Sequence, residues 1–389
     1  MLSIAVFTEC YHPMHNGVVI SVSTFARVLH EMGHEVTIFT AHHPEQEGDE
    51  NGVFRFPSIT LPIRMIYPLA IPIATGEARR MLLEKPFDLI HSNSPMLMGH
   101  VAVSYHERLK IPLVFTYHTI IEEYTHYIPL PHEWVRRRAI KISREYSNKA
   151  DHIITPSEAV AARLRRYHVE KPITVIPTGI DLDTIDTVES DHVRVRYGIP
   201  DDATLLVCAG RVAQEKNLPR LLKAFKLILQ RIPETHLLLI GGGPEEDSLL
   251  ELAEKIGIAN RFHITGVIPW EDVIRGMRGA DIFVFTSTTE TQGLVIGEAM
   301  ACNLPVVTVD ADAQRDIITH GVNGVLVHDD EAPFADAVCA LIADPEKRKQ
   351  MGTAARKRAE QISAHRCTER LLDVYQQVIA ARTWNEIIG

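Results

Sequence analysis

Two glutamates with seven residues between them, Glu290 and Glu298, follow a short apolar run in the second half of the sequence. Gly293 between them can open a helix, which would place Glu290 in the preceding loop and Glu298 inside the helix. The backbone N–H groups of Gly293 and Leu294 would then face a ligand such as a phosphate from the positive end of the helix. The pattern therefore predicts one ligand held by both carboxylates, one reaching hydroxyls of a hexose and the other a ribose.

A structural role is the alternative for these glutamates, because the helix dipole favours acidic residues near an N-terminus. Glu298, however, stands between the small residues Gly297 and Ala299. An unpaired carboxylate in such an apolar run would cost free energy, so a ligand or a polar partner is expected there.

Two permanent cations, Arg211 and Lys216, follow another apolar run and Gly210. The guanidinium of Arg211 can bind two oxygens at once, while the ammonium of Lys216 acts as a point charge. Such a pair suits a diphosphate. The alternative is that Lys216 forms an ion pair with Glu215 or with another surface acid.

The first half of the chain offers two candidates at expected strand ends. Gly17 adjoins a helical pattern and would let a phosphate approach the helix start, although Asn16 and Gly17 could also form a plain turn. His118 follows the apolar run 113–117, and its two nitrogens can donate to and accept from sugar hydroxyls. A structural histidine is the alternative, and His91 is a second candidate of the same kind.

Short β-branched runs alternate with helical patterns along the whole chain. Between the first two runs, residues 19–32 carry apolar side chains at helical spacing and Gly33 follows, as in a helix with a glycine after its end. Continuous apolar strands between helices indicate parallel sheets that are covered on both faces. The expected strands are 3–7, 35–40, 89–91, 113–117, 152–155 and 174–176, followed by 204–209, 236–240, 262–265, 282–286, 305–309 and 324–327.

The two series of strands predict an α/β protein with two doubly wound Rossmann-like domains. We expect one domain at residues 1–180, a second at 200–366, a hinge in the polar stretch 181–199, and a last helix at about 367–384. Ligands of such sheets bind beyond the carboxyl ends of the strands, so two facing domains would share a central cleft.

Composition favours a globular protein and disfavours several classes of partner. The chain has 389 residues, 46% of them hydrophobic, and its formal charge of −10 argues against a generic nucleic-acid binder. Residues 1–180 contain 18 basic and 18 acidic side chains, whereas residues 181–389 contain 22 and 32. The five scattered cysteines predict neither disulfides nor zinc and fit a reducing cytoplasm. No apolar stretch is long enough to predict a membrane span, and the N-terminal run suits a strand better than a signal peptide.

Taken together, the candidate residues resemble the retaining glycosyltransferases of family 4, which have the GT-B fold. The resemblance covers essentially the whole chain, and the glutamate pair is its most specific part. It implies that the second domain binds a nucleotide-diphosphate sugar and that the final helix, residues 367–389, crosses back to the first domain. The residues that carry the resemblance are Gly17, His118, Arg211, Lys216, Glu290 and Glu298.

The resemblance also implies roles on the donor side. Arg211 and Lys216 would bind the donor diphosphate, and the backbone at Gly293 and Leu294 would face a phosphate. The expected donor is UDP-glucose. Stabilising the charge of the departing diphosphate would matter more than a strong base.

The remaining implied roles concern the sugar, the ribose and the base. Glu290 would bind hydroxyls of the transferred sugar, and Glu298 would bind the ribose. His118 would lie near the reacting carbon, and Ile268 in the segment 265–268 would help to hold the base.

The sequence departs from the family at one position and imitates a metal motif at another. Many members have two glycines in the first loop, where this chain has Asn16 and Gly17. Asp181 and Asp183 resemble a metal-binding pair of aspartates, yet they stand in the expected hinge. We interpret them as structural and expect no required metal or cofactor.

The acceptor is expected on the first domain, where basic residues gather beside Trp134. Together with the apolar segment 59–74, they favour docking on an anionic membrane, whereas a solvated helix face and a core-facing loop are the alternative. The basic residues are Arg136, Arg137, Arg138, Lys141 and Arg144, and a second cluster of Arg163, Arg165 and Arg166.

Short segments around Gly17, His118 and Glu290, with residues 123–127, also resemble the branch that glucosylates diacylglycerol. This implies a hexosyltransferase of glycolipid synthesis, cytoplasmic or peripheral on the inner face of the plasma membrane. Other acceptors stay open: a sugar, an inositol phosphate or a polyprenyl-linked glycan. A catalytically inactive sugar-nucleotide sensor is a further alternative. So is an NAD-dependent oxidoreductase, although the glycine run 241–243 lacks the spacing of a dinucleotide-binding loop.

Overall fold

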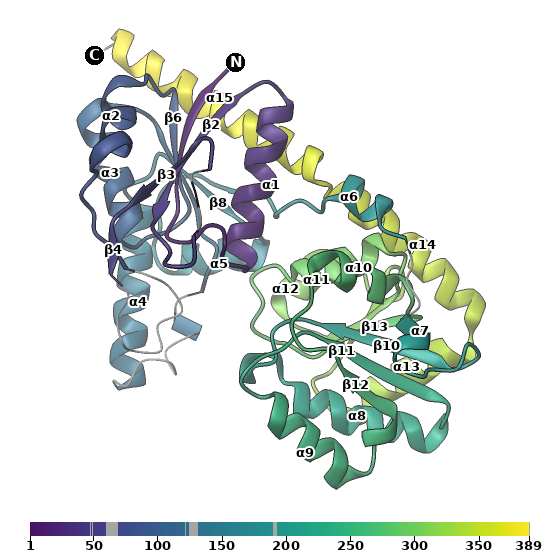
Figure 1. Cartoon of the computed structure of the whole chain (residues 1–389). Helices are drawn as coiled ribbons and strands as arrows, with labels where there is room; N and C mark the ends of the chain where they lie inside the picture. Colours follow the sequence, from purple (N-terminus) through teal and green to yellow (C-terminus); the bar gives the residue numbers. More distant parts are fainter. Residues whose placement is uncertain are drawn as a thin grey trace. The chain divides into compact units, whose positions relative to one another are not determined.

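The computed structural model describes residues 1–46, 48, 50–59, 69–120, 122–123, 131–189 and 193–388. It consists of two compact units, one formed by Met1–Gly179 with Ala364–Gly389 and the other by Ile180–Ser363 (Figure 1). Each unit is built on a parallel sheet with helices on both faces, so the expected pair of Rossmann-like domains is confirmed.

The first unit contains a seven-stranded sheet in the order β3-β2-β1-β6-β7-β8-β9. Its strands pair in parallel and bury apolar side chains such as Phe7, Phe39 and Phe115. The chain order reverses between β1 and β6, so the loops after these strands meet at a topological switch point. The strands are β1 (Ser3–Phe7), β2 (Glu35–Ala41), β3 (Val53–Phe56), β6 (Leu89–Ser92), β7 (Leu113–Thr116), β8 (His152–Thr155) and β9 (Ile173–Val175); β4 (Ser58–Ile59) and β5 (Leu69–Ala70) form a separate antiparallel pair.

Helices cover both faces of this sheet. The first helix, α1 (Gly17–Glu31), lies on the same side as α15 (Ala364–Ile388), while α2 and α3 lie on the other side (Figure 1). The positive φ of Gly33, 82°, lets the chain turn directly after the first helix, as the sequence predicts. The other helices of the unit are α2 (Gly76–Glu84), α3 (Leu97–Leu109), α4 (His132–Ser147) and α5 (Glu158–Arg166).

The second unit contains a six-stranded parallel sheet in the order β12-β11-β10-β13-β14-β15. Here the order reverses between β10 and β13, which is the second switch point. The strands are β10 (Thr204–Ala209), β11 (Thr235–Ile240), β12 (Phe262–Ile264), β13 (Ile282–Phe285), β14 (Val306–Val309) and β15 (Gly324–Val327).

The helices of the second unit lie on both faces of its sheet (Figure 1). One group contains α10, α11 and α12, and the other contains α8, α9 and α13. Their bounds are α6 (Leu182–Thr187), α7 (Val193–Arg196), α8 (Leu218–Arg231), α9 (Glu246–Ile256), α10 (Trp270–Arg278), α11 (Leu294–Ala301), α12 (Asp312–Ile317), α13 (Glu331–Ala343) and α14 (Pro345–Gln361).

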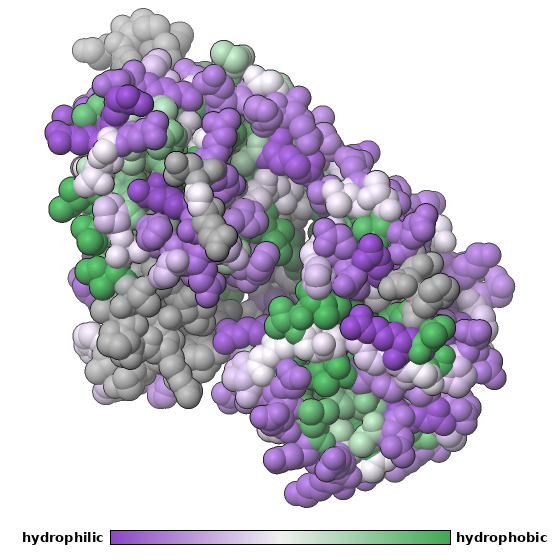
Figure 2. Space-filling view, viewed as in Figure 1, coloured by the Kyte–Doolittle hydropathy of each residue, from purple (hydrophilic) through white to green (hydrophobic). Residues whose placement is uncertain are grey.

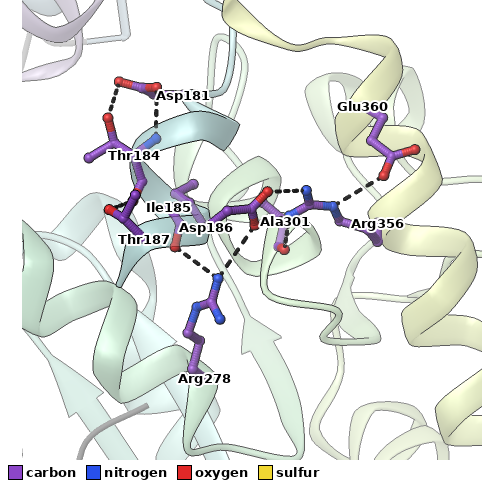
Figure 3. A network of polar contacts seen from close by, with 9 residues as sticks. All are labelled: Asp181, Thr184, Ile185, Asp186, Thr187, Arg278, Ala301, Arg356 and Glu360. Atoms are coloured by element: carbon purple, nitrogen blue, oxygen red, sulfur yellow. Dashed lines mark hydrogen bonds and ion pairs between the residues drawn. The ribbon is translucent and has the colours of Figure 1, made fainter. Parts of the chain in front are cut away.

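The described residues of the expected hinge, 181–189 and 193–199, belong to the second unit. Asp186 on α6 accepts hydrogen bonds from Arg356 at 2.7 and 2.8 Å and from Arg278 at 3.5 Å (Figure 3). The chain passes between the units at 179–180 and 363–364 instead. These contacts fix α6 to its own unit.

The face of the molecule seen in Figure 2 is largely hydrophilic. On the face seen in Figure 2, hydrophobic residues are exposed in small groups among hydrophilic ones. Among the described residues, no helix has the length and apolar character to cross a membrane. The apolar segment 59–74 lies mainly outside the described residues.

Candidate active site

The loops after β10 and β13 meet at the switch point of the second unit. The first of these loops carries Lys216 at the end of a short 3₁₀ turn, and the second carries Glu290. Lys216 Nζ lies 2.5 Å from Glu290 Oε1, and both side chains are largely buried. Two groups that stand 74 residues apart in sequence thus form one ion pair at the carboxyl edge of the sheet.

The surroundings of this ion pair fix the position of the ammonium group. Lys216 Nζ lies 5.7 Å from the centroid of the Phe285 ring, so the aromatic face attracts the cation as well. Lys216 thus pairs with a largely buried carboxylate of the site. Arg211, by contrast, is exposed and forms no ion pair with any described residue, so its guanidinium can turn toward an anion.

Gly293 is the N-cap of α11 and adopts the left-handed conformation with φ 74°. Gly293 has no side chain that could cap this helix start, so the first N–H groups, including that of Leu294, receive no cap from the N-cap residue and can face a ligand. A methyl group added at Gly293 would lie 3.1 Å from Ile296 Cδ1 and 4.0 Å from Glu290 Cγ. The helix start and the Lys216–Glu290 pair are therefore neighbours, which gives an anion both backbone donors and a cation.

Glu298 lies within α11 and has a different partner. Its Oε1 accepts a hydrogen bond of 2.7 Å from Trp270 Nε1 at the start of α10. Burial raises the pKa of Glu298 to about 7, although this hydrogen bond opposes the rise. The hydrogen bond from Trp270 thus fixes the carboxylate but offsets only part of the free-energy cost of burying it. Hydrogen bonds from ligand hydroxyls could offset the rest.

The segment 265–268 follows β12 and lies next to the glycine run 241–243. Thr265 Oγ1 accepts a hydrogen bond of 3.1 Å from the backbone N–H of Gly241. Ile268 is half-buried and, with Ile240 and Thr265, lines a hollow beside α10. A Cβ at Gly241 would lie 2.0 Å from the carbonyl oxygen of Gly210, so close packing of two loops explains this glycine without a dinucleotide.

In the first unit, His118 follows β7 and is half-buried. Its Nε2 lies 2.8 Å from Asn93 Oδ1, at the end of the neighbouring strand β6. Burial lowers the pKa of His118 to about 4, so its ring is neutral near pH 7. His118 is therefore a polar, uncharged group at the carboxyl edge of this sheet.

His91 is a structural histidine. Its Nε2 lies 2.7 Å from Thr116 Oγ1, and its Nδ1 lies 2.6 Å from the hydroxyl of Tyr375 on α15. Both ring nitrogens are satisfied inside the core, and burial lowers the pKa of His91 to about 3. It has no capacity left for a ligand.

Gly17 is the first residue of α1 and not the residue before it. Asn16 caps the helix, and its Oδ1 accepts hydrogen bonds from the N–H groups of Val18 and Val19 at 2.9 and 3.0 Å. A phosphate at this helix start would have to displace the cap or use the remaining N–H groups.

The sequence analysis did not identify three residues that lie near the candidate groups: Asn93, Trp270 and Glu9. Glu9 follows β1 and accepts a hydrogen bond of 2.6 Å from the N–H of Met98, and burial raises its pKa to about 7. It stabilises the start of α3, which has no cap from its own N-cap residue. Each follows or lies near a strand end, and that position was the only signal available.

The aspartate pair at 181–183 has a structural role at Asp181. Its carboxylate accepts hydrogen bonds from the N–H and the hydroxyl of Thr184 at 3.3 and 2.9 Å and so caps α6 (Figure 3). In the described part of the chain, no group of three or more His, Cys, Asp or Glu residues could hold a metal ion.

Two family models match the chain, one per half. The model "Glycosyltransferase Family 4" matches residues 15–184, and "Glycosyl transferases group 1" matches residues 189–358. The chain is 29% identical to an alpha-monoglucosyldiacylglycerol synthase from Streptococcus pneumoniae, over 99% of this chain and 88% of that protein. It is 26% identical to a protein of the same name from Acholeplasma laidlawii, over 96% and 97%.

Other relatives carry other names. A D-inositol 3-phosphate glycosyltransferase from Saccharomonospora viridis is 30% identical over 79% of this chain and 74% of that protein. Among solved structures, HepE from Anabaena in complex with UDP-glucose has a TM-score of 0.75 at 20% identity, covering 97% of this chain and all of that one.

The two doubly wound domains and these matches define a nucleotide-sugar-dependent hexosyltransferase with the GT-B fold. The chain belongs to glycosyltransferase family 4, and its relatives include the diacylglycerol glucosyltransferase branch. The oxidoreductase and sensor alternatives are thereby set aside.

Proposed function

We propose that this enzyme transfers glucose from UDP-glucose to diacylglycerol with retention at the anomeric carbon. The observation that carries the donor part is the Lys216–Glu290 ion pair beside the uncapped start of α11. Cation, carboxylate and free N–H groups meet at a switch point, where sheets of this kind bind nucleotides. The solved HepE complex, which has the same fold, supports UDP-glucose as the donor.

Each charged group has one role in this proposal. Lys216, Arg211 and the N–H groups at Gly293 and Leu294 stabilise the diphosphate as negative charge builds on it. Glu290, adjacent to Lys216, holds hydroxyls of the glucose.

Two further groups hold the ends of the donor. Glu298, oriented by Trp270, accepts hydrogen bonds from the ribose, and the backbone near Ile268 holds the base. We also assign a contact with the sugar to His118, and a backbone contact with a phosphate or the acceptor to Gly17.

The chemical step that we infer needs no metal and no cofactor. The acceptor hydroxyl attacks the anomeric carbon from the face that the diphosphate leaves, as the C–O bond to the diphosphate breaks. The proton of the hydroxyl passes to the departing phosphate oxygen, so no side chain has to act as a strong base. Lys216 and the start of α11 supply the stabilisation that a metal would otherwise provide.

Diacylglycerol as the acceptor is supported by the names of two relatives that match nearly the whole chain. The surface of α4 also suits a lipid bilayer. Trp134, Arg137 and Lys141 are exposed on one side of this helix, while Val135 and Ala139 are buried on the other. A tryptophan beside basic residues is typical of a helix that lies at a membrane interface.

The charge on this surface is smaller than the sequence alone indicates. Glu133 pairs with Arg137 at 3.0 Å and with Arg136 at 3.8 Å, and Glu145 pairs with Lys141 at 3.6 Å.

The second basic cluster, on α5, is also partly neutralised. Arg163 forms ion pairs with Glu122 and Glu123 at 3.2 and 2.6 Å, so the three arginines of this cluster are not all available to a membrane. The proposal therefore assigns membrane contact to α4, on the inner face of the plasma membrane.

The acceptor is tested by competition between lipid and soluble acceptors. The enzyme with UDP-glucose receives vesicles that contain diacylglycerol, myo-inositol 1-phosphate or free glucose, and the products are identified by mass spectrometry. We expect glucosyl-diacylglycerol to form fastest. Transfer to inositol phosphate and none to the lipid would contradict the proposed acceptor and favour the inositol-phosphate alternative, which a relative's name also supports. Glu290→Gln is the control for background hydrolysis.

A further inference from the structure

Asn93 stands directly after β6, and its side chain is almost entirely buried, with 7% of the residue exposed. Its backbone N–H donates to the carbonyl of Phe7 on β1 at 2.8 Å, which anchors the residue to the centre of the sheet. Its Oδ1 lies 2.8 Å from Nε2 of His118, the candidate group after the next strand. The amide thus faces the histidine from a fixed position.

A neutral imidazole has one N–H and one lone pair, and its hydrogen-bond partners decide which nitrogen carries the hydrogen. An amide oxygen can only accept, so Nε2 of His118 must donate to Asn93 Oδ1. Nδ1 then carries the lone pair. Among the described residues, no hydrogen bond reaches Nδ1 of His118.

His91 provides a contrast one strand away. Both of its nitrogens have partners, Thr116 Oγ1 and the hydroxyl of Tyr375. His91, within β6, is saturated, whereas His118, after β7, has one hydrogen bond among the described residues, and Asn93 decides which of its nitrogens stays open.

We propose that Asn93 is a positioning residue that holds neutral His118 in the Nε2–H tautomer, so that Nδ1 accepts the hydrogen of a sugar hydroxyl. The inference rests on the proposed function, because it assigns a ligand to His118. It also explains why a neutral ring suits the site: an imidazolium would repel positive charge that develops at the anomeric carbon.

The tautomer can be measured without any activity assay. Protein labelled with ¹⁵N-histidine is studied by long-range ¹H–¹⁵N NMR at pH 7, and the signals of His118 are assigned by their loss in His118→Gln. We expect a protonated Nε2 and an unprotonated Nδ1, with Nδ1 shifting on addition of UDP-glucose. A wild-type His118 with its hydrogen on Nδ1 would overturn the proposal.

Two variants of Asn93 separate positioning from simple stability. In Asn93→Ala we expect a mixture of tautomers at His118 and a fall in kcat on the order of tenfold, with KM for the donor changed less. Asn93→Asp keeps an acceptor at the same place, so Nε2 should stay protonated, while the added negative charge should raise the pKa of His118. An unchanged His118 tautomer in folded Asn93→Ala would refute the role.

Internal controls make each outcome decisive. The signals of His91 should be unchanged in Asn93→Ala. Asn148→Ala removes an amide whose hydrogen bonds go to the backbone of His168 and Glu170, and it should alter neither the His118 signals nor the activity. If Asn93→Ala does not fold, the wild-type and Asn93→Asp spectra decide the question. If His118 has the expected tautomer but the enzyme transfers no glucose, only the proposed function is contradicted. If the enzyme transfers glucose but His118 carries its hydrogen on Nδ1, only the role of Asn93 is contradicted.

Discussion

At the scale of single residues, the two candidate glutamates and the two candidate cations of the second unit differ in their interaction partners. Lys216 and Glu290 hold each other, Glu298 is held by Trp270, and Arg211 extends into solvent. The residue types and spacing in the sequence identified these side chains, because charged groups at strand ends are not required for folding. The partners Trp270 and Asn93 could not be predicted, because their contacts join separate strand ends of the fold.

The ammonium of Lys216 is expected to be indispensable for turnover. Lys216→Ala should lower kcat by about 10²- to 10³-fold, because it removes one preorganised charge from the departing diphosphate. Release of UDP from UDP-glucose measures this effect. Lys223→Ala, on the exposed side of α8, is the matched control and should behave as wild type. A folded Lys216→Ala enzyme with normal turnover would disprove the role.

Glu298 should make the protein less stable at high pH. Its folded-state pKa of about 7 lies above its ordinary value of 4.5, so the folded protein keeps a proton that the unfolded chain has lost. Stability is therefore lost as the pH rises from 4.5 through 7. Glu298→Gln removes this cost while its amide oxygen can still accept from Trp270, so we expect a gain of about 1–3 kcal/mol at pH 8 and almost none at pH 4.

Urea unfolding at both pH values measures this difference. The control is Glu254→Gln on α9, where the side chain is exposed and no such pH-dependent gain is expected. A gain of equal size at pH 4 and pH 8 would show that the charge of Glu298 is not its cause.

At the scale of elements, most strands were predicted to within one or two residues, because buried parallel strands are continuous apolar runs. The edge strand β3 (Val53–Phe56) was missed, since Arg55 interrupts it and most of it is only half-buried. The expected hinge at 181–199 contains α6, which Asp186 links to Arg356, a residue 170 positions away. Tertiary contacts of this kind leave no local pattern in the sequence.

The start of α11 depends on Gly293. Gly293→Ala should cost about 1–2 kcal/mol, because an L-residue is strained at φ 74° and its Cβ would crowd Ile296. It should also weaken donor binding, since the N–H groups beside it would move. Gly257→Ala after α9 has φ 78° with no atom within 4 Å, so it should show similar strain without the loss of binding.

Thermal unfolding and calorimetric titration with UDP measure the two effects on Gly293→Ala and Gly257→Ala. Equal loss of UDP affinity in both variants would mean that the start of α11 does not bind the donor.

At the scale of the whole molecule, the bulk charge of −10 conceals two different units. The first carries a local basic and aromatic surface on α4. The second places Lys216 and Glu290 near the start of α11, where we propose that the donor diphosphate binds, although its half of the sequence is acidic. The sequence revealed this division, but not that Glu133 and Glu145 neutralise part of the basic surface. Net charge was therefore a poor guide to either ligand.

Membrane binding through α4 should depend on charge and salt. Basic residues near an anionic bilayer contribute about 1 kcal/mol each, so replacing three by glutamine should weaken vesicle binding on the order of 100-fold. Co-sedimentation with anionic vesicles at low and high salt measures this. The variant changes Arg137, Arg138 and Lys141, and the control changes the exposed Lys347, Lys349 and Lys357 of α14. Equal binding by both variants would contradict the assignment of the membrane surface to α4.

The central claim is that the donor diphosphate binds at the carboxyl edge of the second unit. A crystal structure of the wild-type enzyme with UDP tests it most directly. We predict phosphate oxygens within hydrogen-bond distance of Lys216 Nζ and of the N–H groups at Gly293 and Leu294, with the ribose on Glu298. UDP bound elsewhere, or a diphosphate that contacts neither Lys216 nor the start of α11, would contradict the account.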